Sequence, residues 1–184
     1  MMNIVSKIIS LIILLAAGAW SSESLFRLDN SWTTDFGKSV KLGSFAAQPT
    51  LLTLIYTHCA TACPVAVSRL MKVNDLAKQE NISMHIALVS MDTTRDTPKR
   101  LNEFRVEQKL SEKDWSLLSG REEDVRTLAV ALGFNYQKLE DSSEIMHSNR
   151  LVLLNEAGEI KHSFDGLNQS AEEILAQIKA LEKK

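Results

Sequence analysis

Residues 51–64 read LLTLIYTHCATACP and contain both cysteines of the chain, Cys59 and Cys63. The apolar run before the cysteines predicts a buried strand, and the helical spacing of apolar residues after Pro64 predicts a helix. Proline suits the first turn of a helix, where an N–H is not needed and its fixed φ is already helical. We therefore expect a strand, a turn and a helix, with both sulfurs at the helix N-terminus.

The position of the two cysteines indicates chemistry rather than packing. A helix dipole and the free N–H groups of a first helical turn favour a thiolate over a thiol. The thiolate is the form that binds a metal ion or attacks a disulfide. The alternative is an inert buried pair or a small structural disulfide, although a disulfide closing so short a loop stabilises little in the chain-entropy model.

Strands and helices are expected to alternate along the rest of the chain. Apolar runs predict strands at residues 50–56, 82–90, 115–118, 134–139, 151–154 and 159–164. Helix signals are the spacing at residues 64–79, Thr97 before Pro98, and capping boxes at Ser119/Glu122 and Ser170/Glu173. Residues 25–28 alternate like a short strand, and residues 32–42 predict a β-hairpin that turns near Gly37. This order favours an α/β sandwich with a mixed sheet.

Length and charge limit the classes of function. The chain has 184 residues, of which 45% are hydrophobic, and this suits one domain with a substantial core. The net charge is −2 and no basic block is present, so nucleic acid is not an expected partner. We expect the domain to be a monomer.

The N-terminus has the features of a secretory signal peptide. Lys7 precedes a short apolar run at residues 8–17, and Ala17-Gly18-Ala19 resembles a cleavage site. We therefore expect residues 1–19 to be a signal peptide and residues 20–184 to form a single exported domain in the periplasm. The competing interpretation is an uncleaved segment that retains the protein at the membrane. Export leads to an oxidising compartment, where a disulfide would be a normal state of a redox-active pair.

A third candidate ligand is His147, which lies in a predicted loop at residues 144–149 just before a strand. In an α/β sandwich, such a loop can lie beside the start of the first helix. Two thiolates and one imidazole suit Cu(I), whereas structural zinc usually takes four ligands. His58 is a candidate for a fourth ligand of zinc. His85 and His162 lie in predicted strands, where a core or surface role is the expected one.

Four motifs occur in a specific order: Thr57-x-Cys59-x-x-x-Cys63-Pro64, Val89-Ser90-Met91-Asp92-x-x-Arg95-Asp96-Thr97-Pro98, Leu118-Ser119-Gly120, and His147-Ser148 before Leu151-Val152-Leu153-Leu154-Asn155-x-x-Gly158. In this combination the chain resembles the SCO/SenC family from about residue 25 to residue 180. Members of that family are copper-binding, thioredoxin-like proteins linked to assembly of the CuA centre of cytochrome c oxidase.

The resemblance implies a thioredoxin-like fold, with a mixed sheet flanked by helices and an N-terminal β-hairpin extension. It implies that Cys59, Cys63 and His147 bind copper, as Cu(I) and also as Cu(II). The implied partners are subunit II of cytochrome c oxidase, or another copper acceptor, and a periplasmic thiol reductant. The family's acidic pair falls on Asp92 and Asp96, for which turn and cap chemistry is the favoured interpretation.

The sequence leaves an alternative function open, that of a thiol-disulfide oxidoreductase in which Cys59 and Cys63 are a redox-active pair. Its substrates would be the CuA-site cysteines or other periplasmic cysteines. Redox thioredoxins usually have two residues between the cysteines and a proline in the facing loop, whereas here three residues intervene and no proline lies near His147. We therefore do not expect a conventional enzyme. A purely structural or sensing module is a third class.

Overall fold

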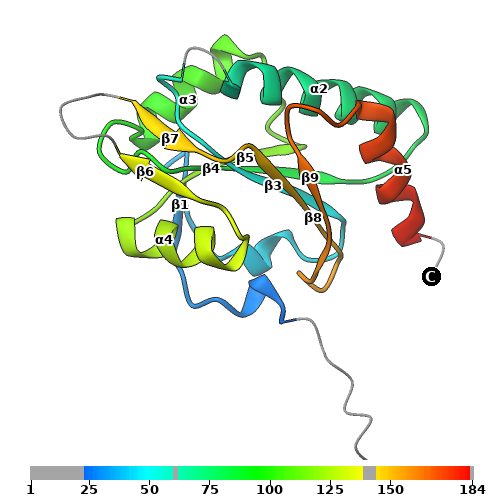
Figure 1. Cartoon of the computed structure of the whole chain (residues 1–184), viewed down its shortest axis with the longest axis horizontal. Helices are drawn as coiled ribbons and strands as arrows, with labels where there is room; N and C mark the ends of the chain where they lie inside the picture. Colours follow the sequence, from blue (N-terminus) through cyan, green and yellow to red (C-terminus); the bar gives the residue numbers. More distant parts are fainter. Residues whose placement is uncertain (1–22, 60–61, 139–143, 183–184) are drawn as a thin grey trace, which may run out of the picture.

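The computed structural model describes residues 23–59, 62–138 and 144–182 (Figure 1). The signal peptide predicted at residues 1–19 lies outside the described residues. Within the described ranges, none of the helices combines the length and the apolar character that crossing a membrane requires.

A seven-stranded mixed sheet with the order β2-β1-β5-β4-β3-β8-β9 forms the centre of the molecule. Its strands are β1 (Trp32–Thr34), β2 (Ser39–Val40), β3 (Thr50–Ile55), β4 (His85–Ser90), β5 (Trp115–Ser119), β8 (Arg150–Leu154) and β9 (Ile160–Asp165). The three central strands β3, β4 and β5 are parallel, and β8, β9 and the β1–β2 hairpin add antiparallel pairs at the two sides. The predicted mixed sheet and N-terminal hairpin are confirmed.

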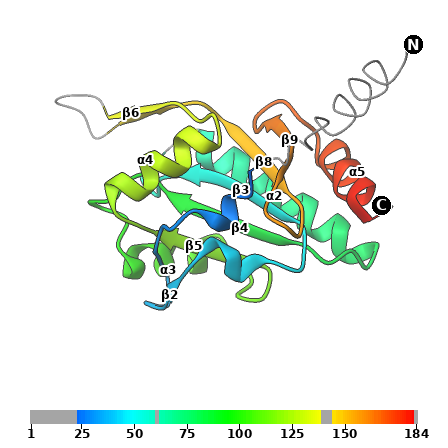
Figure 2. The same ribbon diagram turned by 90° about the horizontal axis from the view of Figure 1, so that it is seen from below.

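Helices cover both faces of this sheet. They are α2 (Ala62–Gln79), α3 (Pro98–Glu107), α4 (Glu122–Ala131) and α5 (Ala171–Glu182). Figures 1 and 2 show α2, α3 and α5 on one face and α4 on the other. Right-handed crossovers explain why α2 and α3 share a face, because they connect the parallel strands β3, β4 and β5, which progress in one direction across the sheet. Every residue of β3 and β4 is therefore buried.

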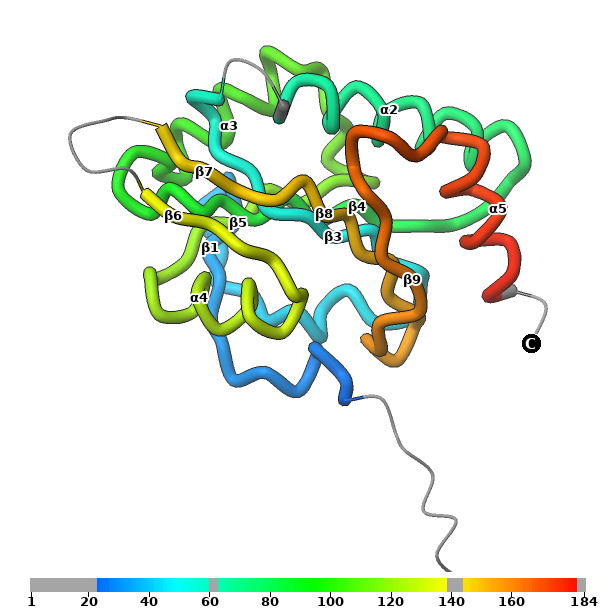
Figure 3. Tube along the Cα trace, in the orientation of Figure 1, coloured from blue at the N-terminus to red at the C-terminus, as the bar shows by residue number. Residues whose placement is uncertain are grey.

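A second, two-stranded sheet carries the predicted third ligand. Strand β6 (Tyr136–Lys138) pairs antiparallel with β7 (Ile145–His147), and Tyr136 lies opposite His147. Figure 3 follows the chain from β7 directly into β8. The prediction of a loop at residues 144–149 is wrong for residues 145–147, because pairing with β6 draws them into a strand that their own sequence does not indicate.

Local signals predicted most element ends correctly. Thr97 accepts a hydrogen bond from the Arg100 N–H at the start of α3, and Ser170 and Glu173 form the predicted capping box of α5. Gly37 adopts a φ of +76° at the turn between β1 and β2, which favours glycine.

Two local predictions are wrong. Residues 25–28 do not form a strand: Leu25–Arg27 is a 3₁₀ helix, η1, whose first turn is capped by the side chain of Ser24. A second 3₁₀ helix, η2, spans Leu42–Phe45. The second wrong prediction is the capping box at Ser119 and Glu122. Helix α4 starts at Glu122 without a side-chain cap, because Ser119 belongs to β5 and its hydroxyl donates to the Thr33 carbonyl.

Candidate metal centre

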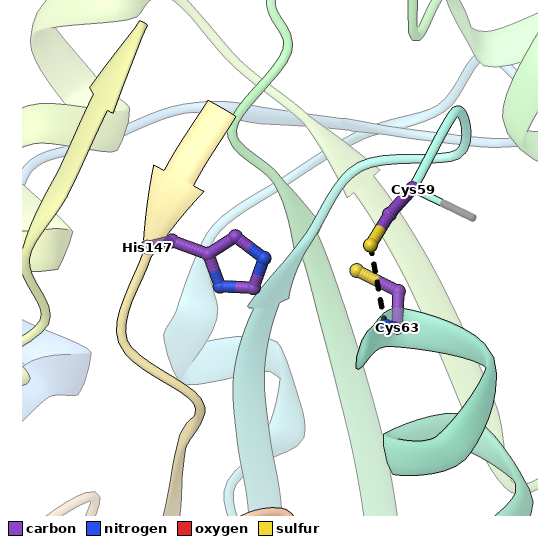
Figure 4. A group of neighbouring side chains, drawn as sticks. All are labelled: Cys59, Cys63 and His147. Carbon is purple, nitrogen blue, oxygen red and sulfur yellow. Dashed lines mark hydrogen bonds between the residues drawn. The ribbon is translucent and has the colours of Figure 1, made fainter. Parts of the chain in front are cut away.

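The structure brings the three predicted ligands together at one end of the central strands. One ligand atom each from Cys59, Cys63 and His147 lies within 4.8 Å of the others. Figure 4 shows the imidazole of His147 facing the two sulfurs. Cys59 comes from the turn after β3, Cys63 from the first turn of α2, and His147 from the last position of β7.

Cys59 has the environment that the sequence predicted for a sulfur at a helix N-terminus. Its backbone N–H donates to the Tyr56 carbonyl at 3.3 Å, which closes a turn just after β3. The N–H of Cys63, in the first turn of α2, donates to Cys59 Sγ at 3.4 Å (Figure 4). A backbone donor at this position stabilises negative charge on the sulfur. The two cysteines are not joined by a disulfide.

Cys63 differs from the expectation of a thiolate. The pKa of its thiol is raised to about 12, chiefly by burial; the backbone of Tyr56 opposes this rise, and the nearby Cys59 and Asp96 add smaller upward contributions. Burial therefore favours the neutral thiol over the thiolate in the metal-free protein, because desolvation outweighs the hydrogen bond that favours the charged form. A cation that binds here must displace this proton.

His147 is held between two aromatic rings. Phe134 stacks against it with 5.9 Å between ring centroids, and Tyr56 meets it edge-on at 5.7 Å. Its Nδ1 lies 3.0 Å from the carbonyl oxygen of Ser148. Since a carbonyl oxygen can only accept, Nδ1 carries the proton and Nε2 carries the lone pair, the tautomer that a metal-binding histidine needs.

The donor set fits a soft cation. Two sulfurs and one imidazole nitrogen match the preference of Cu(I), and they fall short of the four ligands usual for structural zinc. His58 does not join this group among the described residues. Its exposed ring lies with Asp92 and Asp96 instead, at 3.8 Å from the Asp96 carboxylate.

The two aspartates accept hydrogen bonds from the loops around the cysteine turn. Asp96 accepts hydrogen bonds from the Thr57 N–H at 2.9 Å, the Thr57 hydroxyl at 2.6 Å and the Ser90 hydroxyl at 2.5 Å. Asp92 accepts from the Arg95 N–H at 3.2 Å and forms an ion pair with the Arg95 side chain. This is the turn chemistry favoured from the sequence, and it ties the loop after β4 to the turn that carries Cys59.

Sequence reasoning missed the aromatic surroundings of the site. Tyr56 ends the apolar run of β3 and Phe134 follows α4, and neither position carries a signal that separates it from an ordinary core residue. Only their packing against His147 identifies them. The other two histidines outside the site are structural, as predicted: His85 stacks on Phe45 and His162 packs against Phe164.

Comparison with known proteins gives consistent results. The family model SCO1/SenC matches residues 21–183. The SCO1 protein homolog of Bacillus subtilis (strain 168) is 26% identical over 147 residues, which cover 78% of this chain and 76% of that protein.

Solved structures of Sco proteins have the same fold as this chain. The copper-bound ScoI of Arabidopsis thaliana has a TM-score of 0.74 at 20% identity, covering 84% of this chain and 97% of that one. The copper-bound ScoI of Bradyrhizobium japonicum has a TM-score of 0.70 at 22% identity, covering 83% of this chain and 96% of that one. The predicted thioredoxin-like fold is confirmed by these neighbours. Because the family model spans nearly the whole chain, the protein belongs to the SCO1/SenC family.

Proposed function

We propose that this protein is an exported copper metallochaperone of the SCO type, which holds Cu(I), and also Cu(II), through Cys59, Cys63 and His147. The observation that carries the proposal is the convergence of two sulfurs and one imidazole nitrogen within 4.8 Å of one another, from three separate elements. The copper-bound relatives from Arabidopsis and Bradyrhizobium share the fold that creates this convergence.

Each ligand has a defined part in holding the cargo. The Cys59 sulfur already accepts a backbone N–H, Cys63 loses its proton on binding, and His147 offers Nε2 because its Nδ1–H is engaged with Ser148. Three ligands leave room for an incoming thiolate from an acceptor. Transfer by ligand exchange follows, and we propose that the acceptor is the CuA site of cytochrome c oxidase subunit II or a similar copper site.

The proposed location follows from the N-terminal sequence. Residues 1–19 would direct export, and residues 20–184 would act as a single periplasmic domain. Cleavage would release this domain, whereas an uncleaved segment would hold it at the membrane. A thiol reductant in that compartment would then keep Cys59 and Cys63 ready to bind copper.

The test is an anaerobic titration of the reduced protein, residues 20–184, with Cu(I) against a competing chelator. We expect one tightly bound Cu(I) per chain, a clear loss of affinity in His147→Ala, and no tight site in the Cys59→Ser, Cys63→Ser double variant. His162→Ala is the matched control, because this exposed imidazole lies in β9 and contacts Phe164. Copper binding that survives in the double variant would refute the proposal.

A thiol-disulfide oxidoreductase is the second candidate. Its support is that no disulfide joins the two cysteines, of which Cys59 has the N–H contact expected of an attacking sulfur. One solved relative is described as carrying a disulfide switch, namely BsSco. The His147→Ala variant separates the two functions: disulfide exchange should largely survive in it, and copper binding should not.

A further inference from the structure

The two halves of the metal centre belong to different sheets. The cysteines follow β3 in the seven-stranded sheet, whereas His147 ends β7 in the two-stranded sheet, and no ladder joins the two sheets among the described residues. A two-stranded sheet has little stability of its own and depends on its packing. The short connection from β7 to β8 and the contacts between the sheets together decide where His147 lies relative to the sulfurs.

Tyr56 makes such contacts with both halves. Its carbonyl accepts the Cys59 N–H that closes the cysteine turn, and its ring packs edge-on against the ring of His147. Its hydroxyl donates to Glu144 at 2.9 Å, directly before the first residue of β7. The side chain is almost fully buried, with 2% of its surface exposed, so this polar bond has a defined geometry.

The hydroxyl of Tyr56 lies in contact with Glu144 and with Cys59. Burial raises its pKa above the ordinary value, and its contacts with Glu144 and Cys59 raise it further. The phenol O–H donates to the Glu144 carboxylate, and a hydrogen bond to a charged acceptor is among the stronger ones.

We propose that Tyr56 is a positioning residue for the metal centre: its hydroxyl, bound to Glu144, holds the start of β7 against the cysteine turn and so sets the distance of His147 from Cys59 and Cys63. This inference rests on the proposed copper site. Partners that orient a metal ligand without touching the metal commonly change affinity about 10- to 100-fold when removed.

The test variant is Tyr56→Phe, which removes one oxygen and keeps the ring that packs on His147. Tyr136→Phe is a matched control, because Tyr136 lies opposite His147 in the β6–β7 ladder and its buried hydroxyl finds no hydrogen-bond partner among the residues that the structure describes. We expect Cu(II) affinity to fall about 10-fold in Tyr56→Phe, with a shifted sulfur-to-copper charge-transfer band. The control should show neither change.

Glu144 provides the second arm of a double-mutant cycle. Its side chain is exposed at the surface, so Glu144→Ala is expected to fold. This variant should reproduce most of the effect of Tyr56→Phe, the double variant should be no worse than Tyr56→Phe alone, and Glu144→Gln should recover most of the affinity because it keeps an acceptor oxygen. Additive losses, or a Tyr56→Phe variant that behaves like the control, would overturn the inference.

Hydrogen exchange of the metal-free protein separates this inference from the proposed function. Amides of residues 145–147 should exchange faster in Tyr56→Phe than in Tyr136→Phe if the hydroxyl holds β7 in place. Equal exchange rates would refute the positioning role. If the wild-type protein bound no copper, the proposed function would fail, and the exchange rates would still decide whether Tyr56 positions His147.

Discussion

Two groups of metal-binding residue types flank the turn after β3, and they differ in what their polar atoms already contact. In both groups the ligand atoms lie within 4.8 Å of one another. The first group contains Cys59, Cys63 and His147, and its imidazole presents a lone pair on Nε2. In the second group the carboxylates of Asp92 and Asp96 accept hydrogen bonds from the loops around them.

The difference shows that closeness alone does not make a metal site. A cation in the second group would have to displace donors from Asp96, and the Thr57 N–H and Ser90 hydroxyl that bond to it would then lose their buried partner. In the first group a cation replaces a thiol proton, which protein and solvent can accept at neutral pH. The hydrogen bonds of the second group hold the turn that carries Cys59, whereas the first group suits the copper site that we propose.

The largest expected effect tests this division directly. Cys63→Ser should weaken Cu(I) binding by more than about 100-fold, beyond the range seen when outer partners of a ligand are removed. His58→Ala should change it less than about threefold, because the exposed His58 ring lies with the aspartates. Competitive chelator titration measures both, and comparable losses would contradict the comparison.

An intermediate effect is expected from Asp96→Asn. The amide has the shape of the carboxylate, but it cannot accept all three hydrogen bonds from Thr57 and Ser90, so unfolding free energy should fall by about 2 kcal/mol. Copper stoichiometry should stay at one per chain. Urea denaturation gives the stability, with Asp29→Asn, an exposed carboxylate paired with Lys41, as the control. Loss of the copper site in a folded Asp96→Asn protein would show that Asp96 belongs to the metal centre.

The smallest expected effect is a change of stability with pH at His85, whose Nε2 forms a hydrogen bond with the Ser116 hydroxyl. Burial lowers its pKa to about 4, with Arg105 lowering it and Asp114 opposing. The unfolded chain therefore binds a proton at higher pH than the native state does. The contribution of neutral His85 to the free energy of unfolding is complete above pH 6.5 and declines towards pH 4. Between pH 7 and pH 5.5 this decline is about 1 kcal/mol.

The measurement is the free energy of unfolding across this pH range in the wild type and in His85→Asn. The wild type should lose more stability on acidification than the variant, which has no ionisable group at this position. Parallel pH profiles for the two proteins would show that His85 does not titrate as a buried group.

The residue pattern was sufficient where local interactions decide the structure. The apolar run before Cys59, the proline after Cys63, the Thr97 cap and the capping box at Ser170 and Glu173 act within a few residues, so their elements were predicted. The prediction failed where a distant partner decides: Ser119 stays in β5 because it pairs with Thr33, and residues 145–147 form a strand because β6 lies beside them.

For the site, the sequence by itself determined the candidate ligands and the fold class, through the order of the motifs around Cys59, Cys63 and His147. Tertiary structure alone decided that His147 faces the sulfurs, that His58 does not, and that Tyr56 bridges the two sheets. It also decided that burial raises the pKa of the Cys63 thiol. The physical reason is that burial and long-range packing are properties of the assembled core, and a local pattern carries no measure of either.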